Sequence, residues 1–315
     1  MKHILLIYYS QTGQLKQIAE SFIRPIIENH SITIDMEELK PITLYPFPWP
    51  FGQFIDQFPE AVSLIPPALH PFQFDEGKKY DLIILAYTVW FLSPSPPITA
   101  FLKSAKGKMV LSETPVVTLI ACRNMWLEAH EQVKQLIKQA NAYILDNVVL
   151  TDRGSSLKTL ATTPRWMLTG KRDAFWRIFP RAGIHNDDII ATQRFGKALL
   201  FSILNGDIQK TNPVLTGLKA ATVDQRLIDS EKIARRSFLI WGKLFQLLGP
   251  QGHFLRKIAA IAYGLFLIII IATVVPAMMI IRVLLKPWRQ HAIDKERQYF
   301  ESPSGSEDDR MEKFS

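Results

Sequence analysis

Cysteine is almost absent from this chain: Cys122 is the only one among 315 residues. A single thiol excludes an internal disulfide framework and is typical of a protein from a reducing compartment. The 7 histidines are scattered without metal-ligand spacing, so we expect no metal site. No partner base accompanies Cys122 in the sequence. We therefore interpret it as a packed residue at a strand end rather than a nucleophile.

The usual nucleotide-binding fingerprints are also missing. The first predicted strand-to-helix turn, "SQTGQL" at 10–15, contains one glycine. It is therefore neither the GxGxxG of dinucleotide-binding folds nor a P-loop, which argues against ordinary dinucleotide binding and ATP hydrolysis. The N-terminus "MKHILLIYYSQTGQ" has one basic residue and too short an apolar run for a signal peptide, so we expect this part in the cytoplasm.

Negative charge is the scarcer sign: 29 Asp and Glu stand against 37 Lys and Arg, for a net charge of +8. That balance suits an anionic partner such as a nucleotide, a nucleic acid or a lipid headgroup. The basic run 165–181, with Trp166 and Trp176, has the composition of a nucleic-acid surface. We interpret it as a face that contacts lipid headgroups, with a plain solvated face as the alternative, and expect no nucleic-acid partner.

One segment has no charge at all: "IAAIAYGLFLIIIIATVVPAMMII" at 258–281. As a helix it would be roughly 36 Å long, enough to cross a hydrocarbon core of about 30 Å. We predict a transmembrane or membrane-embedded helix over 258–284, after a helical membrane-proximal segment at 206–257. A polar tail at 285–315 follows, and we expect its end to be disordered. Basic residues flank both sides, so a single pass and an in-plane helix both stay open, with a buried core helix as the alternative.

Apolar runs alternate with helical patterns through the first two thirds of the chain. Five runs are typical of strands: 3–9, 31–39, 80–90, 114–122 and 142–152. Because strands that alternate with helices form parallel sheets covered on both faces, the pattern predicts an α/β domain over 1–205. Two stretches, 41–75 and 152–185, interrupt the alternation as insertions near the expected site, and 186–204 is typical of one capped helix.

The turn after the first strand has the groups that a phosphate site needs. Ser10 and Thr12 offer hydroxyls, Gly13 offers a flexible backbone, and the following helix offers free N–H groups. "SQTGQL" resembles the flavodoxin phosphate loop, except that Leu15 replaces a final Thr and so removes one hydroxyl donor. The resemblance implies a flavodoxin-like doubly wound five-stranded parallel sheet of order 2-1-3-4-5, with FMN at the switch point. Together with the patterns above, we expect this fold to have insertions and a C-terminal membrane helix.

The resemblance also implies which residues hold the flavin. The loops after strands three and four would hold the isoalloxazine ring, with an arginine that stabilises its reduced anion. The implied cofactor-binding residues are Ser10, Gln11, Thr12, Gly13, Gln14 and Leu15 in the turn, Thr88, Val89, Trp90 and Phe91 in one loop, and Arg123, Asn124 and Trp126 in the other. No catalytic residue is evident; His70 and His185, in the two insertions, are the acid/base candidates.

A more specific resemblance rests on three stretches: "YYSQTGQL", "PFPWPFGQFIDQFPE" at 46–60 and "WFLSPSPPITAFLKS" at 90–104. Together they are similar to flavodoxin-related proteins of bacterial dialkylresorcinol gene clusters, often labelled condensing enzymes. Carbon–carbon condensation needs a nucleophilic cysteine with histidine partners, which this chain lacks. The resemblance therefore implies a membrane-associated FMN oxidoreductase that acts on an apolar ring or quinone-like substrate, beside a ketosynthase-type partner at the bacterial cytoplasmic membrane.

Two alternatives stay open at this stage. The chain could be a non-catalytic flavodoxin-like scaffold that tethers a biosynthetic partner to membrane lipid, which the missing hydroxyl at Leu15 favours. It could also be a generic NAD(P)H:quinone or FMN reductase, which would add NAD(P)H as a second cofactor.

Overall fold

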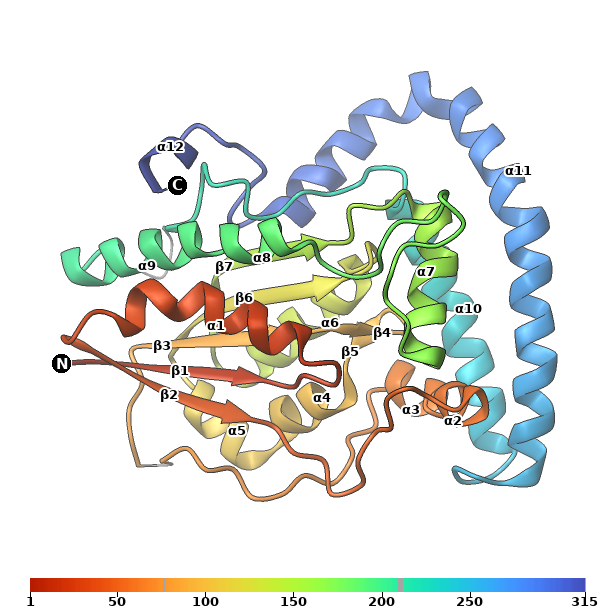
Figure 1. Cartoon of the computed structure of the whole chain (residues 1–315), viewed down its shortest axis with the longest axis horizontal. Coiled ribbons are helices and arrows are strands. Elements are labelled where there is room, and N and C mark those ends of the chain that lie inside the picture. Colours follow the sequence, from red (N-terminus) through yellow and green to blue (C-terminus); the bar gives the residue numbers. More distant parts are fainter. Residues whose placement is uncertain (76, 209–211, 315) are drawn as a thin grey trace.

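A five-stranded parallel sheet forms the centre of the computed structural model (Figure 1). The structure describes residues 1–75, 77–208 and 212–314, apart from the side chains of 156–157, 271–272 and 274–288. The strand order is β2-β1-β3-β6-β7. The strands are β1 (Lys2–Tyr8), β2 (Ile32–Glu38), β3 (Leu82–Tyr87), β6 (Pro115–Cys122) and β7 (Tyr143–Thr151).

The predicted α/β domain with five parallel strands is confirmed. The observed order β2-β1-β3-β6-β7 differs from the predicted order 2-1-3-4-5, because the fourth and fifth strands along the chain belong to a separate small sheet. An unpredicted two-stranded antiparallel sheet, β4 (Val89–Trp90) with β5 (Ser93–Pro94), intervenes after β3. The predicted strand 80–90 therefore ends early, at Tyr87. The reason is local: the chain reverses directly after Trp90, and Val89 pairs back with Pro94.

Helices cover both faces of this sheet (Figure 1). One core cluster joins Ile4 and Leu6 of β1 to its helices, and the other joins Leu5 and Ile7, as alternation along a strand requires. The first face carries α1 (Gln14–Ile27), α8 (Asn186–Ala191) and α9 (Gln193–Asn205); the second carries α4 (Pro96–Lys103), α5 (Ala105–Leu111) and α6 (Leu127–Gln139). The predicted helix 186–204 is thus divided in two, at Thr192.

Both insertions contain short helices near the carboxyl ends of the strands. The first contains α2 (Phe51–Asp56) and α3 (Phe58–Val62), and the second contains α7 (Ser156–Thr169). The two insertions contact each other, because Trp49 N donates a hydrogen bond to Met167 O at 2.8 Å. They therefore form one cover over this edge of the sheet.

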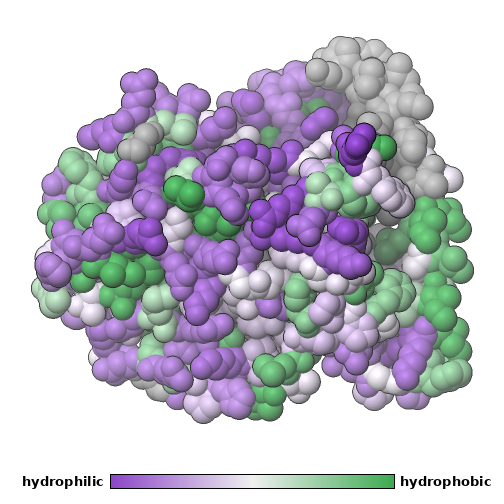
Figure 2. Space-filling model, viewed as in Figure 1, coloured by the Kyte–Doolittle hydropathy of each residue, from purple (hydrophilic) through white to green (hydrophobic). Residues whose placement is uncertain are grey.

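The C-terminal third forms a helical hairpin of α10 (Ile228–Leu247) and α11 (Phe254–Glu301), on the right of Figure 1. The predicted membrane helix 258–284 lies within α11, and the side chains of 271–272 and 274–284 are outside the described residues. Within the part that is described, no helix is both long and apolar enough to cross a membrane. Figure 2 shows apolar residues along the described part of α11.

The expectation that the end of the polar tail 285–315 is disordered is wrong. Helix α11 continues to Glu301, and the chain then folds back onto the sheet and ends in α12 (Met311–Phe314). Ser304 Oγ donates a hydrogen bond to Asp146 Oδ1 at 2.7 Å, and Phe314 is buried in the first core cluster. The physical reason is that Asp146 is a buried carboxyl group in β7, and such a group needs hydrogen-bond donors.

Candidate functional site

The turn between β1 and α1 ends at Gly13, the N-cap of α1, which has φ at +79° and no side chain that could cap the helix. Ser10 Oγ accepts a hydrogen bond from Lys16 N at 3.2 Å, which closes the turn and occupies one of the first N–H groups of the helix. The N–H groups before Lys16 and the positive end of the helix dipole are available to an anionic group.

A cleft of about 190 Å³ opens beside this turn. The structure places ten of the sequence-predicted cofactor residues on its walls: Ser10, Gln11, Thr12, Gln14, Leu15, Thr88, Val89, Trp90, Phe91 and Arg123. They come from three segments that follow β1, β3 and β6, and Gly13 lies in the first of these. The fold brings them together because neighbouring parallel strands end at the same edge. Their role in holding a cofactor stays a prediction.

The loop after β3 gives the cleft an aromatic wall. Phe91 and Leu92 have φ of +50° and +56°, a left-handed conformation that costs about 1 kcal/mol or more for each non-glycine residue. This reversal brings the Phe91 ring to 5.0 Å from the ring of Phe54 in α2, centroid to centroid. Trp90 packs edge-on against Tyr45 of the first insertion at 5.1 Å. The cleft is therefore apolar on this side.

The end of β6 contributes a neutral thiol and a cation. Burial raises the pKa of Cys122, so its sulfur is a thiol at neutral pH and a poor nucleophile. Burial lowers the pKa of Arg123, but a guanidinium remains charged in proteins. Arg123 Nη1 donates to Thr159 Oγ1 of α7 at 3.4 Å. This wall therefore favours negative charge on a neighbouring group.

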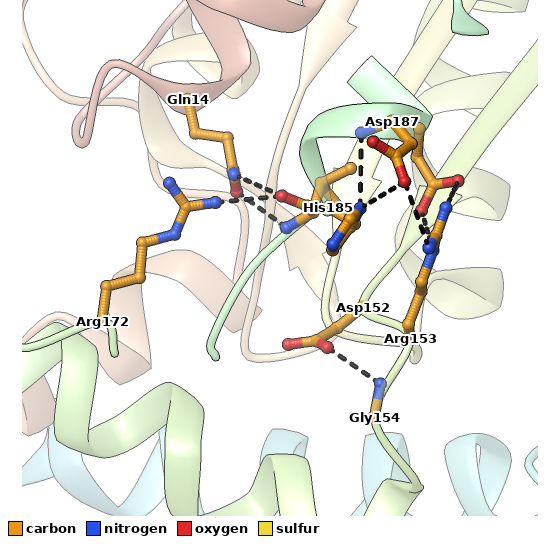
Figure 3. Close-up of polar contacts among 9 residues, drawn as sticks. Gln14, Asp152, Arg153, Gly154, Arg172, His185 and Asp187 are labelled. Carbon is orange, nitrogen blue, oxygen red and sulfur yellow. Dashed lines mark hydrogen bonds and ion pairs between the residues drawn. The ribbon is translucent and has the colours of Figure 1, made fainter. Parts of the chain in front are cut away.

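Asp152, directly after β7, fixes the second insertion across the cleft. Its Oδ1 accepts a hydrogen bond from Gly154 N at 3.0 Å, and its Oδ2 accepts one from Gly183 N at 2.9 Å. Gln14 binds the same segment (Figure 3): Nε2 donates to Ile184 O at 3.0 Å, and Oε1 accepts from Ile184 N at 3.1 Å. A Cβ at Gly183 would lie 2.6 Å from Gln14 Oε1, so this approach requires glycine.

Arg172 adds a second cation to this side of the cleft. Its Nε donates to Ala182 O at 2.7 Å and its Nη2 to Ile184 O at 3.0 Å, beside Gln14 (Figure 3). The guanidinium also lies over the ring of Trp166, at 5.0 Å from its centroid. The sequence pattern assigns Arg172 to a headgroup-contacting run, but the structure places it next to the cleft.

Two predicted ring-binding residues lie elsewhere. Among the described residues that line the cleft, neither Asn124 nor Trp126 occurs. Trp126 is the N-cap of α6 and is fully buried in the second core cluster, where its ring packs against His130 at 5.8 Å. The sequence shows an aromatic near a strand end, which is equally typical of a core residue.

The two acid/base candidates are not on the cleft walls that the structure describes. His70 borders a separate shallow pocket with Phe72 and Lys103. His185 is half-exposed at the N-cap of α8, where its Nδ1 accepts a hydrogen bond from Asp187 N at 3.3 Å (Figure 3). An acid/base role for either histidine stays a prediction.

Sequence reasoning did not predict the part of the site that comes from the insertions. The unpredicted cleft residues from the insertions are Phe54, Asp152, Thr163, Trp166, Met167, Gly183 and Ile184, and Ala121 and Cys122 at the end of β6 were not predicted either. Asp152 is the only carboxylate among the described residues of the lining. Its position after an apolar run was the available signal, since polar residues at strand ends gather at one edge of a parallel sheet.

No protein-family model matches the chain, and no curated protein matches it. Several solved structures resemble parts of it, and three of them are described here. A flavoprotein in complex with FMN from Lactobacillus acidophilus NCFM is 17% identical, covers 47% of this chain and 93% of its own, and has a TM-score of 0.39. A flavodoxin from the domain Archaea is 8% identical, covers 64% of this chain and 99% of its own, and has a TM-score of 0.36.

A flavone reductase is 8% identical, covers 65% of this chain and 64% of its own, and has a TM-score of 0.35. The strand order β2-β1-β3-β6-β7 defines the architecture of this chain, and the residues that line the cleft determine which ligands fit it.

Proposed function

We propose that the cleft binds FMN and that the chain is a flavin-dependent oxidoreductase for an apolar ring or quinone-like substrate. The observation that carries this proposal is the start of α1 at Gly13, where the N-cap has no side chain and the helix borders a cleft with one aromatic wall and one cationic wall. A phosphate suits the helix start, and a flat, electron-accepting ring suits the rest. When bound, FMN supplies hydride transfer.

The residues of the chain have separable roles in this proposal. The N–H groups at Gly13 and Gln14 and the hydroxyls of Ser10 and Thr12 bind the phosphate. Arg123 stabilises negative charge on the reduced ring. Trp90, Phe91 and the two insertions exclude water from the reacting face, because their described side chains close the apolar wall.

Leu15 is the point at which the turn fits least well. Leucine has no hydroxyl, so one donor of the flavodoxin loop is missing, and the Leu15 side chain is instead buried in the first core cluster. The backbone donors do not depend on that side chain, and Arg172 supplies a further cation beside Gln14. The donor set therefore still suits a phosphate monoester.

Titration of the full-length protein with FMN, followed by visible absorbance and fluorescence quenching, tests the proposal. The Gly13→Asp variant puts a carboxylate at the helix start, and we expect it to weaken FMN binding by about tenfold or more. Gly206→Asp is the matched control, because both glycines have φ above +70° and, at either one, no atom lies within 4 Å of the place that a Cβ would take. Gly206 lies at the end of α9, away from the turn.

Three results would decide the question. Saturable flavin binding that Gly13→Asp alone impairs supports the site. Equal binding by both variants places the flavin elsewhere, and no binding by the unchanged protein eliminates the cofactor. Steady consumption of NAD(P)H with a simple quinone would identify the generic reductase alternative.

A non-catalytic scaffold is the second candidate function. It is favoured by the engagement of Asp152, whose two carboxylate oxygens accept backbone hydrogen bonds rather than facing the cleft as a free base. The dialkylresorcinol-type substrate and the ketosynthase-type partner belong to the oxidoreductase proposal. If the substrate is of this type, we expect the bound flavin to be reduced or oxidised when a cyclohexanedione or a resorcinol with an alkyl chain is added.

A further inference from the structure

The α10–α11 hairpin carries exposed apolar side chains at helical spacing. On α11, Phe254, Ile258, Ile261, Leu265 and Ile268 recur every three or four residues, and all are exposed. Ile261 is 63% exposed, and Leu247, at the end of α10, is 84% exposed. Single exposed apolar residues are normal on a soluble protein, but a continuous stripe along one helix marks an interaction surface. We call these six residues the hairpin stripe; Figure 2 shows its α11 part along one side of the molecule.

Between Glu231 and Asp294, the stretch that contains the stripe, the hairpin has charge of one sign only. No Asp or Glu occurs between Glu231 and Asp294, whereas this stretch contains nine Lys and Arg. Some of these cations are already paired with acids from outside it: Arg256 with Asp56 and Glu60. The cations Arg236, Lys243 and Lys257 are exposed, and they are interleaved with the hairpin's apolar residues.

This combination identifies the occupant of the stripe. A second copy of the chain would bring two acid-free cationic surfaces together, which repels. An anionic lipid surface satisfies both features at once: acyl chains cover the apolar side chains, and headgroups pair with the cations. We propose that the hairpin stripe docks in the plane of an anionic phospholipid bilayer, with Arg236, Lys243 and Lys257 at headgroup level.

The hairpin is fixed to the rest of the molecule, so docking would orient the whole domain. Arg256 is 1% exposed, and its Nη1 and Nη2 lie 2.8 and 2.9 Å from the two carboxylate oxygens of Glu60 in α3. Tyr263 of α11 stacks on Phe58 of α3 at 4.7 Å between ring centroids. Phe58 also packs against Phe91 at 5.3 Å between ring centroids, and Phe91 lines the cleft. An apolar substrate dissolved in the bilayer would therefore reach the cleft from a fixed direction.

Sedimentation of the full-length protein with vesicles tests the proposal. One set of vesicles is phosphatidylcholine alone, and the other is phosphatidylcholine mixed with phosphatidylglycerol. We expect binding to the mixed vesicles, with about a fivefold loss for each cation removed in Lys243→Gln and Lys257→Gln. The double change Ile261→Asp with Leu265→Asp should reduce binding to both sets by about tenfold or more.

Ile190→Asp is the matched control, because Ile190 of α8 is as exposed as Ile261, at 63%, and is not in the hairpin. It should bind vesicles like the unchanged protein. Far-UV circular dichroism and urea unfolding establish that the Ile261/Leu265 variant is folded, and FMN titration reports the cleft separately.

Three outcomes would overturn the proposal. The first is that the unchanged protein does not sediment with the mixed vesicles, or sediments equally with both sets. The second is that the Ile261/Leu265 variant binds as well as the unchanged protein. The third is a lipid-free dimer, seen by analytical ultracentrifugation, that this double change converts to monomer, which would make the stripe an interface between copies.

Discussion

The cleft and the hairpin stripe are two surfaces of opposite design. The cleft is concave, and hydrogen bonds hold it: Gln14 to Ile184, and Asp152 to Gly154 and Gly183. The stripe is a helix surface, and a buried ion pair and stacked rings hold its hairpin to the body. The difference teaches that the sheet edge fixes polar groups at hydrogen-bond distance from one another. The hairpin instead exposes apolar side chains that make no such directional contacts. The two regions should therefore fail in different ways.

The largest effect should come from Arg256→Ala, which removes the cation between Asp56 and Glu60. Two carboxylates would then remain in a mostly buried environment without compensation, so we expect the free energy of unfolding to fall by about 3–5 kcal/mol. Urea unfolding measures it. Arg226→Ala is the control, because its ion pair with Asp224 is largely exposed and should contribute about 0–1 kcal/mol. Similar losses in both variants would contradict a buried anchor.

In the cleft, Gly183→Ala should be the most damaging small substitution. The new Cβ would lie 2.6 Å from Gln14 Oε1 and 2.9 Å from a ring carbon of Trp166, at φ +83°. Backbone strain and overpacking together should lower the free energy of unfolding by about 2–4 kcal/mol. Gly206→Ala has the same kind of φ with open space around it, and should show the backbone part alone, about 1–2 kcal/mol. If thermal unfolding gives equal values, the close approach is not tight.

Glu231 joins the start of α10 to the start of α6 and should make stability depend on pH. It is buried at the start of α10, where its Oε2 accepts from Glu128 N at 3.2 Å, and desolvation raises its pKa to about 8. The folded protein therefore keeps a proton that the unfolded chain releases near pH 4.5, so stability falls as pH rises through this window.

Between about pH 6.5 and pH 8 we expect a loss of about 2 kcal/mol from this group. The window lies above the pKa of Asp146, which burial raises to about 6, so Asp146 contributes little to the slope. Glu231→Gln should flatten the pH dependence, and urea unfolding at several pH values measures it. An unchanged slope in the variant would assign the effect to other groups.

The smallest effect should come from Gln11→Leu. Gln11 Nε2 donates to Pro46 O at 2.8 Å and so joins the turn to the first insertion. Loss of one partly buried hydrogen bond should lower the free energy of unfolding by about 0.5–1.5 kcal/mol. Gln17→Leu, at an exposed position of α1, is the control and should be neutral. A neutral Gln11→Leu would show that the insertion does not depend on this contact.

Local pattern was sufficient to predict the sheet and the first turn. Apolar runs such as that of β3 and the helical spacing of Leu15, Ile18 and Phe22 in α1 are properties of neighbouring residues. The hairpin β4–β5 escaped prediction because Val89 and Trp90 continue the apolar run of β3, while the reversal depends on two left-handed residues without glycine. Most strand-end residues of the cleft followed from the resemblance to flavodoxins, which implies that the loops after these strands hold the flavin.

Distant contacts decided what the pattern could not. Gln14 and Ile184 are 170 residues apart, and Asp146 and Ser304 are 158 residues apart. Nothing in the polar stretch after 302 indicates that it docks on a buried carboxylate in β7. Trp126 shows the converse. The resemblance to flavodoxins implied that it contacts the flavin ring, but Trp126 is the N-cap of α6 and is buried in the second core cluster.

The stacked rings between the cleft and the hairpin have a thermodynamic consequence. Phe54, Phe91, Phe58 and Tyr263 form a chain of aromatic contacts, with centroids 5.0, 5.3 and 4.7 Å apart. Packed rings of this kind transmit displacement rather than absorb it. If docking on a bilayer increases the affinity of the cleft for its ligand by some factor, the bound ligand must increase the affinity of the protein for the bilayer by the same factor. The affinity of such a protein for a bilayer would therefore depend on whether its cleft is occupied by ligand.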